Sequence, residues 1–153
     1  MSPINQVEWK MIEYPCVEWS EKILTGLPEI DDQHRQLFEL AATFCGDGDH
    51  IRILKSLAML TEYVRVHFRE EEALMAACDY PLLHEHRKLH GQFRHMLFAL
   101  LENARQMSFD EIAEQVKYLI NGWFYNHILI ADFAYVPVVK QLGLATSNEE
   151  PTT

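Results

Sequence analysis

Residues 66–93 read VHFREEEALMAACDYPLLHEHRKLHGQF. Before the central CDYP, His67 and Glu71 stand one helical turn apart, and after it His86 and His90 repeat the same spacing. Residues four apart share a face of an α-helix, so each pair can direct two side chains to one point. The neighbouring steps of both faces are apolar, so the faces are expected to point into a core. The stretch predicts two amphipathic helices with nitrogen and oxygen ligands on their buried faces.

The same helical period continues in both directions and divides residues 30–134 into four amphipathic segments. The core-facing steps are Ile30, His34, Leu37, Ala41 and Phe44 in the first segment; Ile53, Leu57, Leu60, Val64, His67, Glu71 and Leu74 in the second; Leu83, His86, His90, Phe93, Leu97 and Leu100 in the third; and Ala113, Val116, Ile120, Trp123, His127, Ile130 and Ala134 in the fourth. No segment alternates with period two for long enough to predict a strand. The pattern predicts an all-α fold, an up-down-up-down antiparallel four-helix bundle.

Three short breaks separate the four helices. The first, CGDGDH at residues 45–50, contains two glycines, and the second, CDYP, places Pro81 near a helix start. In the third, QMSFDE, Ser108 is expected to cap the fourth helix and Glu111 to complete a capping box. We expect the fourth helix to end near Gly143.

The sequence divides into an N-terminal arm (residues 1–28), a bundle (residues 29–143) and a flexible C-terminal tail (residues 144–153). The arm combines helix breakers with aromatic residues, namely Pro3, Pro15, Gly26, Pro28, Trp9, Tyr14 and Trp19. We expect the aromatic residues to pack the arm across the core. The tail, LATSNEEPTT, lacks apolar periodicity and is expected to fray.

The composition favours one globular domain and excludes several partners. A chain of 153 residues with 48% hydrophobic residues can bury one substantial core. The formal charge of −10, from 13 Lys and Arg against 23 Asp and Glu, repels phosphate backbones and anionic lipid. We therefore expect no nucleic-acid partner and no membrane insertion. No apolar run approaches the roughly 18 residues that a membrane helix needs.

The N-terminus and the cysteines indicate a cytoplasmic protein. The first residues lack a basic segment followed by an apolar run, so no signal peptide is expected. Cys16, Cys45 and Cys78 are odd in number and lack C-x-x-C spacing. They are interpreted as free thiols in a reducing compartment, without a disulfide framework or a zinc site.

Each of the four predicted helices brings histidine to its buried face: His34, His67, His86 with His90, and His127. A buried polar group without a partner costs about 1–3 kcal/mol. A single histidine of this kind is more often a hydrogen-bonded core residue, and a run such as Glu70–Glu72 is more often a solvated face. Five inward histidines together favour a metal site instead. Imidazole with carboxylate suits iron, copper or zinc, and no cysteine falls on the same turns.

The other three histidines have no such spacing. His84 lies about 200° around the helix from His86, and His95 also points away from that face. His50 falls in the first break and is expected in a loop. All three are interpreted as surface residues.

Four longer elements occur in order, one per predicted helix. They are WSEKILTGLPEIDDQH ending at His34, HFREE with His67 and Glu71, YPLLHEHRKLH with His86 and His90, and WFYNHILIADFAY with His127 and Asp132. Together these elements resemble the hemerythrin family, and in particular its single-domain bacterial members. The resemblance extends over nearly the whole chain.

The resemblance implies a cofactor of two non-haem iron ions, in the Fe²⁺ and Fe³⁺ states, with a solvent-derived oxo or hydroxo bridge. The implied metal ligands are His86, His90 and His127 on one iron, His34 and His67 on the other, and Glu71 and Asp132 bridging both. This set leaves one coordination position open, on the iron held by two histidines. Dioxygen would bind at that position.

The implied function is reversible dioxygen binding for oxygen transport, storage or local delivery, with an oxygen-consuming enzyme as recipient. The protein is then not an enzyme, and no residue is assigned a catalytic role. Two other hypotheses stay open: a di-iron enzyme that reduces nitric oxide, peroxide or dioxygen, and an oxygen sensor that acts through a separate partner. A structural bundle or iron store is a further alternative. The family includes both monomers and homo-oligomers.

Two positions need particular local structure. Five residues correspond to about 140° around an ideal α-helix, so His127 and Asp132 can serve one site only if the helix widens locally. Phe124 stands where the family commonly has leucine lining the oxygen pocket. Its larger ring is expected to narrow access to the pocket or to slow oxidation.

Overall fold

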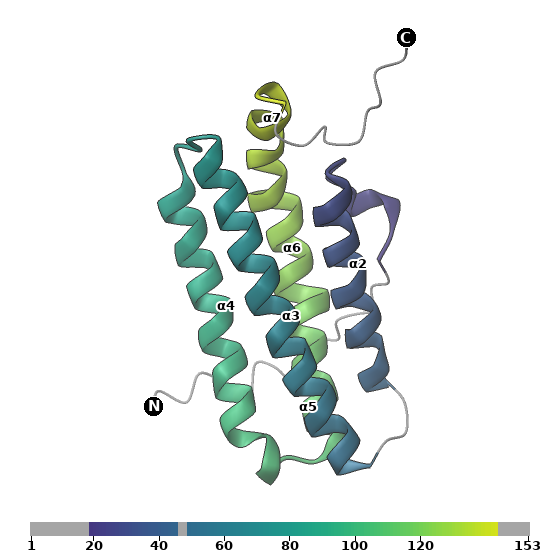
Figure 1. Ribbon diagram of the computed structural model, residues 1–153. Coiled ribbons are helices and arrows are strands. Elements are labelled where there is room, and N and C mark those ends of the chain that lie inside the picture. The colour runs from purple at the N-terminus through teal and green to yellow at the C-terminus, as the bar shows by residue number, and fades with distance from the viewer. Residues whose placement is uncertain (1–18, 46–48, 144–153) are drawn as a thin grey trace.

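The computed structural model describes residues 19–45 and 49–143, and over these ranges the chain is helical with no strand. Three of the four rods are single helices, namely α2 (Pro28–Ala42), α3 (His50–Ala77) and α4 (Leu83–Asn103). The fourth rod is continuous and consists of α5 (Phe109–Lys117), η4 (Tyr118–Phe124), α6 (Tyr125–His127), η5 (Ile128–Asp132) and α7 (Phe133–Gln141). Successive rods run in opposite directions and lie side by side (Figure 1). The predicted antiparallel four-helix bundle is confirmed.

Local sequence explains where the helices begin. Pro28 is the first residue of α2, a position where its missing N–H leaves no helical hydrogen bond unmade. Asp49 caps α3, and its side chain accepts a hydrogen bond from the Arg52 N–H at 2.8 Å. The predicted capping box of α5 is present: Ser108 Oγ accepts from the Glu111 N–H at 3.2 Å, and the Glu111 carboxylate accepts from the Ser108 N–H. Short 3₁₀ turns occur at Glu21–Ile23 (η1), Thr43–Cys45 (η2) and Ala104–Gln106 (η3).

Two separate apolar clusters form the core. The larger is built around Phe38, Phe68, Phe93 and Phe124, and the smaller around Tyr135. On every rod, the inward-facing polar residues lie at or near the point where the rod passes from the larger cluster to the smaller one. Hydrophobic packing therefore closes the bundle on both sides of a polar layer.

Two segments of the fourth rod, η4 and η5, are π-helical. A π turn holds one residue more than an α turn, so it shifts every later side chain around the rod. This shift makes one part of the sequence prediction wrong. Ile130, expected in the core, has 74% of its surface exposed, and Ala134 is also exposed. Tyr135 and Val139 take the buried positions instead.

The described part of the arm, from Trp19 to Leu27, is attached to α2 through Asp31. The buried carboxylate of Asp31 accepts hydrogen bonds from the Thr25 N–H and hydroxyl, both at 2.8 Å, and from the Gly26 N–H at 3.0 Å. Trp19 packs against the larger cluster. The other aromatic residues of the arm, Trp9 and Tyr14, lie outside the described residues, as do Cys16 and the C-terminal tail.

The remaining surface predictions have mixed outcomes. His84 and His95 are exposed, as predicted. His50 is also exposed but is the first residue of α3, so its placement in a loop was wrong; the Asp49 cap starts the helix one residue earlier than the glycine-rich break suggested.

Cys78 is a free, buried thiol. Within the described ranges, no helix combines the length and apolar character required to cross a bilayer.

Candidate metal centre

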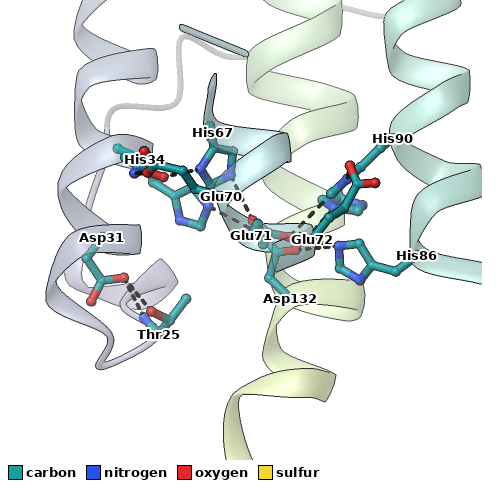
Figure 2. Close-up of polar contacts among 12 residues, drawn as sticks. Thr25, Asp31, His34, His67, Glu70, Glu71, Glu72, His86, His90 and Asp132 are labelled. Atoms are coloured by element: carbon teal, nitrogen blue, oxygen red, sulfur yellow. Dashed lines mark hydrogen bonds and ion pairs between the residues drawn. The ribbon is translucent and has the colours of Figure 1, made fainter. Parts of the chain in front are cut away.

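Seven polar side chains from all four rods meet in the layer between the two apolar clusters. They are His34 from α2, His67 and Glu71 from α3, His86 and His90 from α4, and His127 and Asp132 from the fourth rod. Figure 2 shows all of these side chains except His127 pointing toward one another across the bundle, and His127 Nε2 lies 3.1 Å from Asp132 Oδ1. None has more than 6% of its surface exposed. The structure thus brings together all seven residues that the sequence predicts as metal ligands.

The ligand atoms form two groups that could each hold one metal ion. One group contains Glu71, His86, His90, His127 and Asp132, and the other contains His34, His67, Glu71 and Asp132. Within each group the ligand atoms lie within 4.8 Å of one another. Glu71 and Asp132 belong to both groups. The two carboxylates are thus shared between two sets of imidazoles.

The π-helical segment η5 explains how Asp132 reaches this layer. It begins directly after His127 and ends at Asp132, so a five-residue spacing returns the chain to the same face. The Nε2 atom of His127 and Oδ1 of Asp132 are 3.1 Å apart. The local widening of the fourth helix that the spacing of His127 and Asp132 required is therefore present.

Most of the converging atoms have no hydrogen-bond partner, although they are buried. This holds for the Nε2 atoms of His34, His67, His90 and His127 and for both carboxylate oxygens of Asp132. His67 Nε2 lies 2.8 Å from Glu71 Oε2, yet neither atom has a partner in hydrogen-bonding geometry. Buried polar groups are normally satisfied, and each exception costs about 1–3 kcal/mol. Unshared lone pairs directed at common points fit metal ions as the missing partners.

The charges within the layer also support this fit. Burial would raise the pKa of Glu71, but His67, His86 and His90 outweigh it and hold that pKa well below its usual value. Burial and the charge of Glu71 would likewise raise the pKa of Asp132, yet His127 and His34 lower it to about 2. Both carboxylates are therefore ionised at neutral pH, as metal coordination requires.

Protons and metal ions compete for the same imidazoles. Burial lowers the pKa of His86, but the neighbouring carboxylates outweigh it and raise that pKa to about 9: Asp132 lies 3.2 Å from His86 Nε2, and Glu71 forms a hydrogen bond with the same atom at 2.8 Å. In the metal-free protein, a proton on His86 thus partly replaces the positive charge that the carboxylates attract. Metal binding would release that proton.

Two of the converging histidines, His67 and His90, are held in position by residues outside the layer. Gln33 Oε1 accepts a hydrogen bond from His67 Nδ1 at 2.7 Å, and the Gln33 amide donates in turn to the Glu70 carboxylate. On the opposite side, Glu72 Oε2 accepts from His90 Nδ1 at 3.0 Å. These bonds fix each ring with Nε2 directed inward.

The sequence interpretation missed these supporting residues. It placed Glu71 on the buried face, where the structure also finds it, but it gave Gln33 and Glu72 no role, and the side chain of Glu72 is only 16% exposed. The sequence signal for these supporting residues was their position beside an inward-facing residue on the helix. Residues next to an inward-facing ligand lie about 100° to either side of it on a helix, where they can reach the neighbouring rods.

Aromatic rings close the layer on the side of the larger cluster. Phe124 is fully buried, and its ring centroid lies 5.6 Å from that of His34 and 5.7 Å from that of His67. Phe68 stacks on His90 at 3.8 Å, and Trp123 stacks on His127 at 4.8 Å. Phe124 thus covers the half of the layer with two histidines and excludes water from it.

Comparison with known proteins agrees with this geometry. The family model described as the hemerythrin HHE cation binding domain matches residues 25–139. That range contains all seven converging side chains and their supporting residues.

Relatives of known name match over most of their length. A bacteriohemerythrin of Pseudomonas paraeruginosa is 28% identical over 80% of this chain and 80% of its own. A bacteriohemerythrin of Clostridium acetobutylicum is 29% identical over 77% of this chain and 97% of its own. Myohemerythrin-1 of Phascolopsis gouldii is 29% identical over 76% of this chain and 89% of its own.

Proposed function

The chain belongs to the hemerythrin family, and from this premise we propose that it binds dioxygen reversibly at a non-haem di-iron centre. Membership implies iron binding and an oxygen-related function. The observation that carries the finer proposal is the pair of ligand groups that share Glu71 and Asp132. Oxygen transport, storage or local delivery are the roles that fit such binding.

The proposed ligand assignment follows the two groups. The group with three histidines would hold one iron and the group with two histidines the other, with Glu71 and Asp132 bridging together with a solvent-derived oxo or hydroxo group. Once bound there, a ferrous pair would supply the redox chemistry for reversible binding of dioxygen. The side with two histidines has fewer protein ligands, so it is the side that we assign to dioxygen.

The residues in and around the polar layer favour binding over reduction. Cleavage of an O–O bond requires protons, and Glu71 and Asp132 are held ionised, so neither offers one at neutral pH. Burial together with the charges of Glu71 and Asp132 raises the pKa of Tyr135 well above its usual value, so its phenol retains its proton. Phe124 keeps bulk water away from His34 and His67.

The proposal is tested by cycling oxygen. The protein is loaded anaerobically with ferrous iron, exposed to oxygen, and then freed of oxygen while its visible absorption is recorded. Absorption that appears with oxygen and fades on its removal supports reversible binding. Steady oxygen consumption with accumulation of ferric protein would instead indicate an enzyme that reduces dioxygen, and the same assay with nitric oxide or peroxide tests those substrates.

A further inference from the structure

An open hollow of about 400 Å³ lies on the surface between α3 and α4, directly outside the ligand His90. We call it the arginine groove; its lining residues are Arg65, Arg69, Glu72, Ala73, Arg87 and Arg94. Four of the seven arginines in the sequence therefore line one hollow. The chain as a whole carries a formal charge of −10, so the groove is a cluster of positive side chains on a protein whose net charge is negative.

The acidic side chains near the groove do not balance the four guanidinium groups. Arg65 pairs with Glu62 on the same helix, through contacts of 2.7 and 3.0 Å. Arg87 and Arg94 share the single carboxylate of Glu72, at 3.1 and 3.7 Å.

Within the part of the chain that the structure describes, Arg69 forms neither a hydrogen bond nor an ion pair. The pKa of nearby Glu62 is lowered mainly by Arg65, and the charge of Arg69 adds a smaller effect. Two carboxylates thus face four cations, and the groove retains positive charge.

The geometry suits a compact, multivalent oxyanion. Guanidinium groups bind phosphate and carboxylate through paired N–H donors in a planar fork. The side chains of Arg65, Arg87 and Arg94 are each about half exposed, at 55%, 53% and 50%, so an ion in solution can reach them. The small side chain of Ala73 in the lining leaves room between them.

The groove is connected to the metal layer by two short routes. Glu72 binds Arg87 through Oε1 and His90 Nδ1 through Oε2, so one carboxylate joins the groove to a predicted ligand. Arg94 also lies 5.9 Å above the ring centroid of Phe68, and that ring stacks on His90. A change of charge in the groove therefore acts on His90.

We propose that the arginine groove binds a multivalent oxyanion of the phosphate class, and that binding is transmitted to His90 through Glu72. A bound anion competes with Glu72 for Arg87 and Arg94, which leaves Glu72 a stronger acceptor for the His90 N–H. A more strongly bonded histidine is a more electron-donating ligand, and it stabilises the ferric state. The negative charge of the bound anion also stabilises the ferric state. Transmission to His90 rests on the proposed di-iron function, whereas anion binding in the groove does not.

Binding is measured on the metal-free protein by isothermal titration with pyrophosphate and with inorganic phosphate, at ionic strength held constant with sodium chloride. We expect saturable binding that is stronger for pyrophosphate. The variant Arg69→Ala removes a side chain that contacts no metal ligand and should weaken pyrophosphate binding roughly tenfold. The matched control Arg105→Ala removes the same charge from η3, the short turn beyond the C-terminal end of α4, and should leave binding unchanged.

Three results would overturn the proposal: no saturable heat, equal weakening in both variants, or binding of a polyglutamate peptide without binding of pyrophosphate. The last would assign the groove to an acidic protein partner. In the iron-loaded protein, pyrophosphate should lower the midpoint potential, and Arg69→Ala should abolish that shift. An unchanged potential with intact binding would overturn transmission to His90, while failure to load iron would count against the proposed function alone.

Discussion

The side chains of His127 and Asp132 face the same buried layer, with Nε2 and Oδ1 3.1 Å apart, because a π-helical turn joins them. On an ideal α-helix the two residues would diverge by about 140°. The extra residue in the turn therefore determines whether the fourth rod supplies one ligand or two. Asp132 contributes to both ligand groups, so this local departure from α-helical geometry makes the paired arrangement feasible.

Replacement of His67 by alanine should reduce the iron content from about two ions per chain to about one. His67 is one of only two histidines in its ligand group, so the substitution removes half of the nitrogen ligands there. The bundle should still fold, since its apolar clusters lie on either side of the layer. Elemental analysis and circular dichroism measure both outcomes. His84→Ala, on the exposed face of α4, is the matched control and should retain both ions.

Replacement of Gln33 by alanine should weaken metal affinity roughly 10- to 100-fold without changing ligand identity. The amide oxygen of Gln33 holds His67 Nδ1 at 2.7 Å, and without it the ring is free to turn. Competition with a chelator measures the affinity. Gln36→Ala, also on α2 but exposed, serves as the control. Equal affinities in the two variants would show that the Gln33 hydrogen bond does not position the ligand.

Replacement of Phe124 by leucine should accelerate both oxygen binding and autoxidation. The smaller side chain opens space against His34 and His67, which the phenyl ring now covers. The cavity should also lower the free energy of unfolding by about 1–2 kcal/mol. Stopped-flow absorption and denaturant titration measure the two effects. Unchanged oxygen kinetics would mean that oxygen enters by another path.

Stability of the metal-free protein should fall as the pH rises from 6.5 to 9. The pKa of His86 is raised from 6.5 to about 9 in the folded state because Asp132 and Glu71 outweigh burial. Its stabilising contribution is complete below pH 6.5 and disappears as the pH passes the folded value.

The pKa of Asp132 is lowered to about 2 and that of Glu71 well below 4.5, so their contributions are present above about pH 4.5 and disappear as the pH falls through these lowered values. Denaturant titrations across this range should therefore show maximal stability between about pH 4.5 and 6.5. A stability that increased steadily up to pH 9 would contradict the predicted charge pairing of His86.

Helical periodicity predicts this fold well, because the bundle is built from faces that repeat every three or four residues. It predicts the fourth rod less well. Ile130 satisfies the α-helical period yet is exposed, since the π turns shift the register and no residue type in the sequence marks a π turn unambiguously. The seven converging side chains could be named from the family resemblance. Their supporting contacts, such as Glu72 with His90, depend on how neighbouring rods pack, which periodicity does not specify.

The two ligand groups that share Glu71 and Asp132 are proposed to hold a pair of iron ions. The iron content is therefore to be measured on protein loaded anaerobically with ferrous iron and separated from excess metal. We expect two iron ions per chain. A content of one ion or fewer, in protein that is fully folded by circular dichroism, would contradict this proposal.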